Sequence, residues 1–550
     1  MNDLKRRAMI THPWMVGVAL PLLFAPVSLA APQTPPEDRL DPGYSVEPPT
    51  VPKEPAPLPD AITQVAPVTA AAVPIAGIRF KGVDVPANVA AASQAFIGRP
   101  ADTETLTELA GAMSAAYRKS AVALFTLAIP SQDLSDGVVD VYIAEGRVAE
   151  ILVLKDGKVV ERPLLRGYLE PVLEETPASR ATFERGIALA RRTEGTKVTP
   201  RLKTIPKMPG AAAVLFDIEE KKDGLAVGYD SRESRLIDAG RLAVSGFAYG
   251  TFRPGDVLRG RLSSTPDFDQ SRAANLQYST PIGTDGLSLS LAGAYQETRP
   301  SSIDIEGDAS ILSAGVSYPM LLDFHREVSL TASVDRIEST NTALGSVIAN
   351  ERISTAHFGA KGSWTGSKRA ASGSLLYSRG LGLDEARSAV LGADTAFNKV
   401  EGTGTLVQAL GKSVFLRLKA KGQWSDDILP ASERLQIGGA EFGRGFDNGL
   451  ISFDKGYAAS IEPAWRPLKK GDFKRSEIYV FADYADGSIT PNGVTEFDLD
   501  LSSAGAGVRV GYKDYAMIGV EYAEPTEQPF PGLSDDPVIT VSWSFKYQPQ

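Results

Sequence analysis

The chain ends in the stretch Ile539-Thr540-Val541-Ser542-Trp543-Ser544-Phe545-Lys546-Tyr547, in which apolar and polar side chains alternate without a break. Successive side chains of a β-strand point to opposite faces, so this pattern predicts a strand with one apolar face and one polar face. Its aromatic residues lie toward the end of the strand, where transmembrane barrels concentrate such residues at the membrane interface. The stretch therefore predicts a strand of a β-barrel in a membrane.

Strand-like alternation fills the chain after Lys222, where helical spacing disappears. In a soluble β protein the apolar faces would line a core, whereas in a membrane barrel they contact lipid and the polar faces line a wet lumen. Charges in the middle of strands favour the barrel, and the predicted lumenal residues are Arg417, Lys419, Lys421 and Glu462. The strands are expected near residues 224–230, 238–247, 257–264, 272–281, 286–296, 309–320, 327–337, 351–365, 369–379, 397–410, 412–424, 453–466, 476–486, 501–511, 515–523 and 537–547.

The first 30 residues are typical of a secretory signal peptide. Lys5, Arg6 and Arg7 form a positive start, an apolar stretch follows, and the small residues Ser28 and Ala30 precede the expected cleavage site. Residues 31–74 are rich in proline, which interrupts helices and strand ladders alike, so we expect an extended linker there. The chain is therefore predicted to be exported.

Two copies of a small α+β domain are expected between the linker and the barrel. Residues 75–147 have the order strand, helix, helix, strand, strand, and residues 148–221 repeat it. In the first copy, Asp102 is placed to cap a helix that begins at Thr103. The predicted fold class is thus α+β followed by all-β, with a sixteen-stranded antiparallel transmembrane barrel over residues 222–550.

Composition and motifs argue against an enzyme. The net charge of −10 is unfavourable for nucleic-acid binding, and the absence of cysteine excludes disulfides and thiolate sites. The histidines, His12, His325 and His357, are far apart in the sequence, and no nucleophile or phosphate-binding motif accompanies them. We expect no catalytic residues, no cofactor, no metal site and no nucleic-acid partner.

A connection of unusual length lies between the strands that end near Trp424 and begin near Phe453. It is expected to have no strands or helices of its own, and loops of this length are usually functional. Its tip, Gly443-Arg444-Gly445-Phe446, would need a carboxylate partner if it folded into the lumen. Asp483, on the same strand face as Phe481, is one candidate, and Asp486 is another. From these residues alone, a tip exposed to solvent is equally compatible.

Several motifs in residues 75–147 resemble the first POTRA domain of two-partner secretion transporters, the TpsB family of the haemolysin and filamentous-haemagglutinin export systems. The family has a signal peptide, two POTRA domains and a sixteen-stranded barrel, so the resemblance covers nearly the whole chain after residue 30. The proline-rich segment differs from the plug helix that many members carry there. The matching motifs are Ile78-Arg79-Phe80-Lys81-Gly82, Gly98-Arg99-Pro100, Ile129-Pro130-Ser131-Gln132-Asp133-Leu134, Gly137 and Glu145-Gly146-Arg147-Val148.

The resemblance also implies a role for the loop tip. In TpsB proteins the loop between strands eleven and twelve folds into the lumen with a (V/I)RG(Y/F) tip, which residues 443–446 match except at Gly443. Strand thirteen carries an F-x-D-x-G motif, which Phe481 and Asp483 match, with Ala485 in place of glycine. The resemblance therefore implies an Arg444–Asp483 pair, with Asp486 as the alternative.

The function implied by the resemblance is export of a specific unfolded partner across the bacterial outer membrane. The partner would be a secreted TpsA-like exoprotein of the adhesin, toxin or haemolysin class, captured by POTRA domains in the periplasm. Further expected partners are outer-membrane lipid and lipopolysaccharide, and, for biogenesis, the barrel-assembly machinery and periplasmic chaperones. The main alternative is an assembly factor that inserts other barrels into the membrane. A passive porin would not need two domains before the barrel, and a surface adhesin would have its bulk on the outer side rather than before the barrel.

Overall fold

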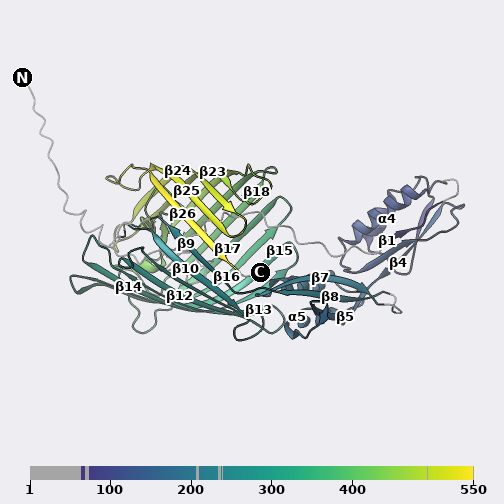
Figure 1. The fold of residues 1–550 in the computed structure, drawn as a ribbon, viewed down its shortest axis with the longest axis horizontal. Helices are drawn as coiled ribbons and strands as arrows, with labels where there is room; N and C mark the ends of the chain where they lie inside the picture. Colours follow the sequence, from purple (N-terminus) through teal and green to yellow (C-terminus); the bar gives the residue numbers. More distant parts are fainter. Residues whose placement is uncertain are drawn as a thin grey trace, which may run out of the picture.

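The computed structural model describes residues 63–68, 73–205, 208, 210–232, 234, 237, 239–491 and 493–548. The predicted signal peptide and most of the predicted linker lie outside these residues. The described chain forms two α/β domains followed by a β-barrel, and the second α/β domain adjoins one end of the barrel (Figure 1). Among the described helices, none has the length and apolar content needed to cross a bilayer.

The first α/β domain packs two helices on one mixed sheet. Asp102 caps α4 as predicted, because its carboxylate accepts a hydrogen bond of 2.8 Å from the backbone N–H of Thr105. That hydrogen bond also lowers the pKa of Asp102. The sheet order is β1-β3-β4-β2, with β2 and β4 parallel and β3 and β4 antiparallel. The elements are β1 (Thr63–Val65), β2 (Gly77–Lys81), α3 (Ala87–Gln94), α4 (Thr103–Tyr117), β3 (Phe125–Ile129) and β4 (Val138–Glu145).

Strand β1 departs from the sequence prediction. Its three residues lie in the segment expected to be a linker without strands, yet they pair in parallel with β3 at the edge of the sheet. The physical reason is a gap in the proline pattern, because the stretch between Pro59 and Pro67 has free backbone N–H groups. Pairing with a strand about 60 residues away leaves no local signature in the sequence.

The second α/β domain repeats the order of the first. Its sheet order is β6-β5-β8-β7, with β5 and β8 parallel and β7 and β8 antiparallel. Its first helical region is divided into α5 and α6, because Pro171 lacks the backbone N–H that a continuous helix would use there. The elements are β5 (Arg147–Lys155), β6 (Lys158–Val159), α5 (Pro163–Gly167), α6 (Glu170–Leu173), α7 (Arg180–Arg192), β7 (Thr196–Thr204) and β8 (Ala211–Glu220).

Arg180 joins the two α/β domains. Its guanidinium donates hydrogen bonds to three backbone carbonyls at the C-terminal end of α4 and beyond it, those of Tyr117, Ser120 and Val122. The backbone N–H of Ala123 also donates to the carbonyl of Ala178, at 2.9 Å. Because these hydrogen bonds link the start of α7 to the end of α4 and to the segment after it, the junction resists bending between the domains.

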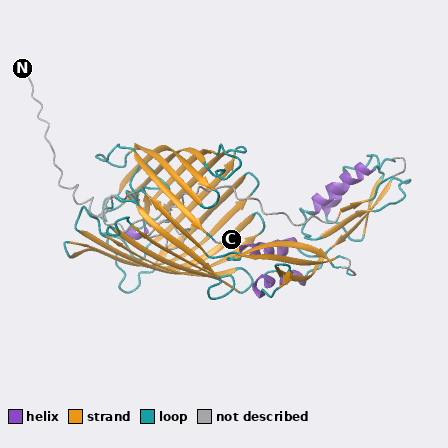
Figure 2. Ribbon diagram, in the orientation of Figure 1, coloured by secondary structure: helices purple, strands orange, loops and turns teal. Residues whose placement is uncertain are grey.

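The barrel is closed and has sixteen strands, as predicted. Neighbours in sequence pair antiparallel, and β26 pairs with β9 to close the wall (Figure 1). Figure 2 shows the barrel strands in orange. The strands are β9 (Gly224–Asp230), β10 (Arg241–Tyr249), β11 (Val257–Ser264), β12 (Ser271–Ile282), β13 (Leu287–Thr298), β14 (Ile305–Leu322), β15 (Arg326–Ala343), β16 (Ser346–Thr365), β17 (Arg369–Gly380), β18 (Asn398–Ala409), β19 (Val414–Trp424), β22 (Lys455–Trp465), β23 (Glu477–Ile489), β24 (Phe497–Tyr512), β25 (Ala516–Glu527) and β26 (Val538–Tyr547).

The two faces of the wall differ as the alternation predicts. Large apolar side chains are exposed on the outside, including Leu262, Leu312 and Leu375, each more than 60% accessible. Side chains of the opposite parity point inward, and many of these are polar or charged and buried. An exposed apolar belt around a polar interior is the arrangement of a barrel surrounded by lipid.

Helix α7 of the second α/β domain docks on turns at one end of the barrel. Arg185 donates hydrogen bonds to the carbonyls of Asp285 and Pro319, at 2.8 and 2.7 Å. Ion pairs of 2.9 Å between Arg192 and Glu327 and of 2.8 Å between Glu194 and Arg259 add to the contact. In addition, Leu322 of β14 packs within the core of the second α/β domain. The domain is therefore held against the turns that follow β10, β12 and β14.

We predict that Arg180→Ala loosens the junction between the α/β domains. A hydrogen bond from a charged group contributes about 1.5–3 kcal/mol. Exchange of the backbone amides at positions 123 and 180 should therefore accelerate about tenfold or more. Hydrogen–deuterium exchange of the purified chain measures this. Arg166→Ala, which removes only the exposed ion pair to Glu170, is the control and should leave both amides unchanged. Equal exchange in the two variants would mean that Arg180 does not hold the junction.

Candidate functional site

The long connection between β19 and β22 folds back into the barrel. It contains a 3-10 turn, η1 (Ala431–Glu433), and a hairpin of β20 (Leu435–Ile437) and β21 (Ile451–Phe453), so the expectation of a loop without elements was wrong. The hairpin forms because its apolar residues bury against the inside of the wall. This apolar cluster consists of Leu435, Ile437, Phe442, Phe446, Leu450, Ile451, Phe453, Ala458, Ala485 and Leu501.

The base of this loop is tied to two sides of the wall. On one side, Glu351 of β16 accepts hydrogen bonds from the backbone N–H groups of Ala431 and Ser432, at 3.1 and 2.9 Å. At the other, Arg434 forms an ion pair of 3.0 Å with Asp454, the residue before β22, and the Asp454 carboxylate accepts a hydrogen bond of 2.7 Å from the backbone N–H of Thr490, just after β23. The side chains of Glu351, Arg434 and Asp454 are buried. The loop is thus fixed before the chain reaches its tip.

Two glycines allow the tip to approach the wall. Gly443 has φ of 71°, a left-handed conformation that other residues rarely adopt. A Cβ on Gly445 would lie 2.8 Å from the backbone carbon of Glu524 at the end of β25. The tip is therefore in backbone contact with the wall, and the side chain between these glycines, Arg444, is 5% exposed.

Arg444 and Asp483 form a bidentate ion pair, the pair that the TpsB resemblance implied. Nε and Nη2 of the arginine lie 3.0 Å from the two carboxylate oxygens, and the backbone N–H of Arg444 donates to the same carboxylate at 3.2 Å. Two parallel hydrogen bonds fix orientation as well as distance. Asp486, the alternative partner, accepts a hydrogen bond from Tyr484 instead.

Further carboxylates surround the same guanidinium, and sequence reasoning did not assign them to it. Nη1 of Arg444 lies 2.8 Å from Glu462 of β22 and 3.4 Å from Glu521 of β25, while Nη2 donates to Ser460 at 3.0 Å. Glu462 was predicted to line the lumen, but its carboxylate contacts Arg444 rather than open water. The guanidinium of Arg444 can be buried because these carboxylates and the Ser460 hydroxyl compensate for its loss of contact with water.

Aromatic rings support the arginines from the wall. The guanidinium of Arg444 stacks on Phe481, 3.4 Å from the ring centroid, and Arg509 stacks on Tyr479 at 3.7 Å. The Phe481 ring lies over β24 at Gly505, where a Cβ would come within 2.6 Å of the ring and 2.1 Å of the Tyr522 carbonyl oxygen. Gly507 makes the same space for Tyr479, with a Cβ 2.3 Å from that ring.

The ion pairs continue toward the end of the barrel that adjoins the α/β domains. Arg417 reaches Glu477 at 2.7 Å and Glu462 at 2.8 Å, and Arg509 bridges the same two carboxylates at 2.8 and 2.9 Å. Glu462 thus contacts three arginines and links the loop tip to the wall. We name this set the lumenal network: Asp230, Arg232, Arg417, Arg444, Glu462, Arg466, Glu477, Asp483, Arg509 and Glu521.

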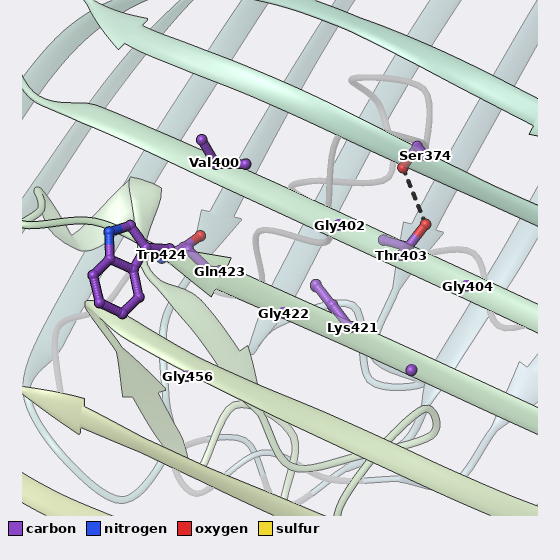
Figure 3. A pocket seen from close by; sticks show the side chains of 11 residues that line it. Ser374, Val400, Gly402, Thr403, Gly404, Lys421, Gly422, Gln423, Trp424 and Gly456 are labelled. Atoms are coloured by element: carbon purple, nitrogen blue, oxygen red, sulfur yellow. Dashed lines mark hydrogen bonds between the residues drawn. The ribbon is translucent and has the colours of Figure 1, made fainter.

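The remaining predicted lumenal residues are not part of the lumenal network, although they share a strand face with Arg417. Lys419 and Lys421 are on β19, half-buried and buried respectively. Lys421 also contributes to a hollow of about 600 Å3 in the wall between β17 and β22. Figure 3 shows glycines at its floor, with Trp424 at one end and a hydrogen bond of 3.1 Å between Ser374 and Thr403. The predicted site residues therefore divide into a connected set around Arg444 and these two lysines.

His357, isolated in the sequence, has partners on the neighbouring strands. Its Nε2 lies 3.0 Å from Asp335 and its Nδ1 lies 2.8 Å from the hydroxyl of Ser378. The order of groups is that of a hydrolase triad, but Ser378 is completely buried and no substrate could reach it. The set is a polar contact inside the wall. In the described part of the chain, no group of His, Asp and Glu has the spacing of a metal site.

Residues 219–510 match the family described as haemolysin secretion/activation protein ShlB/FhaC/HecB. The chain belongs to this family. The match covers more than half of the chain, from the end of β8 into β24, and so includes the inward loop with Asp483 and Glu462. The family consists of TpsB transporters of the outer membrane and not of enzymes, in agreement with the sequence prediction.

Similar proteins support the same assignment. Heme/hemopexin transporter protein HuxB of Haemophilus influenzae is 22% identical over 454 residues, covering 78% of this chain and 79% of HuxB. Among solved structures, CdiB from Escherichia coli matches with a TM-score of 0.67 and 16% identity, covering 87% of this chain and 91% of CdiB. CdiB from Acinetobacter baumannii matches with a TM-score of 0.61 and 16% identity, covering 97% and 96% of the two chains. These structures show that the fold is shared.

We predict that Gly505→Ala disturbs the arginine contacts through the Phe481 ring. The added methyl meets the ring and a backbone carbonyl, and overpacking of this kind costs about 1–3 kcal/mol. Thermal unfolding of the purified barrel in detergent should occur at a lower temperature. Gly404→Ala is the matched control, because a Cβ there has nothing within 4 Å. Unchanged unfolding of Gly505→Ala would refute the packing role given to this glycine.

Proposed function

We propose that this chain exports one unfolded partner protein from the periplasm to the cell surface. The observation that carries the proposal is the family match over the barrel and its inward loop, residues 219–510. The partner would be a TpsA-like exoprotein of the adhesin, toxin or haemolysin class, the partner that two-partner secretion implies. No energy source in the chain is required if folding outside the cell draws the partner outward.

The proposed orientation follows from chain order. The α/β domains precede β9 and touch the turns after β10, β12 and β14, so we place this end of the barrel in the periplasm. With an even number of strands the C-terminal end of β26 returns to the same side, where Gln548 donates a hydrogen bond to the carbonyl of Lys222. The long loop then enters the lumen from the outer side.

The α/β domains are the proposed capture sites. An extended segment can add to a strand edge through backbone hydrogen bonds, which demand little of the sequence and so suit an unfolded partner. Strand β7 ends the second sheet, and its nine-residue edge has backbone N–H groups except at Pro200. Its outward charges, which pair Lys197 with Glu219 and Arg201 with Asp217, limit unspecific pairing at that edge.

The inward loop is proposed to set the shape of the conduit. The bidentate contact with Asp483 and the contacts with Glu462 and Glu521 hold Arg444 against β22 to β25. The loop is thereby kept on one side of the lumen, and the rest of the polar wall is left to face the passing chain. Lys419, which is half-buried, belongs to that polar surface, whereas Lys421 is buried.

The other proposed partners concern biogenesis and surroundings. The exposed apolar belt is suited to outer-membrane lipid and lipopolysaccharide. Insertion of such a barrel would use the barrel-assembly machinery and periplasmic chaperones. The rival function is assembly of other barrels. A TM-score of 0.52 at 14% identity to BamA from Haemophilus ducreyi lacking POTRA domains 1–3 shows a shared fold and does not favour that function.

We predict that deletion of residues 75–146 abolishes secretion of the partner while the barrel still assembles. The deletion removes Ala123 and Leu124 from the apolar cluster of the second α/β domain and leaves its other members, from Val148 onward, in place. Immunoblots of the culture medium and of the outer-membrane fraction measure the two outcomes. Normal secretion by the deletion strain would contradict the transporter proposal.

We predict that Arg444→Ala reduces secretion more than it reduces barrel abundance. The variant leaves Asp483, Glu462 and Glu521 without their shared cation, which costs about 3–5 kcal/mol for a buried pair and frees the tip. Arg336→Ala is the control, since it removes an arginine of the same wall whose ion pair to Glu338 is exposed. Equal loss of secretion and abundance would assign Arg444 a purely structural role.

A further inference from the structure

The edge of β3 in the first α/β domain is occupied by the chain itself. Thr63, Gln64 and Val65 pair in parallel with Leu127, Ala128 and Ile129. The ladder continues through the backbone N–H of Ala66, which donates to the carbonyl of Ile129 at 2.8 Å. A segment that enters the domain from the proline-rich region thus adds a fourth strand at the β3 edge of the sheet β3-β4-β2.

The occupied site has a definite chemistry. Val65 packs against the apolar core of the domain, and Thr63 reaches the hydroxyl of Ser114 on α4 at 3.1 Å. Gln64 points to the opposite face, where it is exposed. Just beyond the strand, the backbone N–H of Val68 donates to the hydroxyl of Thr103 at 2.9 Å. The edge therefore accepts an extended chain with small apolar or hydroxyl side chains at alternate positions.

The second α/β domain provides an internal comparison. Its strand β7 occupies the place of β3, after the helices and antiparallel to the following strand. No described residue pairs with the outer edge of β7, which ends its sheet. Strand β7 also contains Pro200, which lacks a backbone N–H for such pairing. The two equivalent edges therefore differ: β3, which contains no proline, is paired with β1, whereas the outer edge of β7 pairs with no described residue.

Strand β1, which occupies the edge, is short and forms few backbone hydrogen bonds with β3. It has three residues, and Pro67 follows it almost at once, so the ladder cannot extend further along the chain. Its advantage is the covalent connection to the domain, which gives it an effective concentration on the order of millimolar. A longer strand from another protein would make more hydrogen bonds along β3, which has five residues.

We propose that the β3 edge is a binding site for an extended polypeptide, and that residues 63–65 hold it until such a polypeptide displaces them. This inference rests on the proposed capture of an unfolded partner by the α/β domains. The chain's own strand protects an adhesive edge when no partner is present. It also sets a threshold, because only a segment that pairs better than the tethered strand gains the site.

The decisive test uses a peptide that copies residues 60–68, labelled with fluorescein, and the purified full-length chain in detergent. The chain has no cysteine, so Gln64→Cys with Ala128→Cys creates a single disulfide that locks β1 on β3. We expect the oxidised variant to lose peptide binding, measured by fluorescence anisotropy, and to regain the level of the unmodified chain on reduction. Thr126→Cys with Ala144→Cys is the matched control, because it links β3 to β4 and leaves the edge free.

The opposite perturbation is Ala66→Pro, which removes the N–H that donates to Ile129. Release of the tethered competitor should tighten peptide binding about tenfold or more relative to the unmodified chain. Peptide binding that survives the oxidised lock, or that is equal in the lock and its control, would overturn the proposal. The assay involves no secretion, so a chain that binds the peptide as expected but exports no partner would contradict the proposed function alone.

Discussion

Closure of the wall by backbone hydrogen bonds is the constraint on which the rest of the molecule depends. In hydrocarbon an unpaired backbone group is too costly, so the last strand must meet the first, and Ser542 to Tyr547 pair with Leu225 to Asp230. Once the wall is closed, period-two alternation sends every second side chain inward. Polar and charged residues then share a confined lumen, where each charge needs a partner.

The lumenal network satisfies that need and positions the loop at the same time. Arg417 and Arg509 pair with carboxylates of the wall itself, and Glu462 extends the same set to Arg444 on the loop tip. Because one carboxylate serves all three arginines, the position of the loop and the charge balance of the wall are coupled. Glycines of β24 complete the arrangement by making room for the rings on which two of these arginines stack.

The two α/β domains form a continuous unit with the barrel. Arg180 joins the first to the second, and α7 joins the second to turns of the barrel. In the first sheet the edge of β3 is paired with residues 63–65. In the second sheet the equivalent strand, β7, is the last strand, and no described residue pairs with its outer edge. The contacts of Arg180 and α7 thus connect both sheets to one end of the barrel.

The sequence alone determined the features that depend on local period and local capping. Alternation predicted all sixteen strands, and Asp102 predicted the start of α4, because each signal lies within a few residues. For Arg444, the residues by themselves left a lumenal and a solvent-exposed tip equally open, and the family resemblance selected Asp483. Only the tertiary structure revealed the contacts of Arg444 with Glu462 and Glu521, the space made by Gly505, and the pairing of residues 63–65. These depend on the register between strands distant in sequence, and a period of two specifies the face of a side chain but not its neighbour across the barrel.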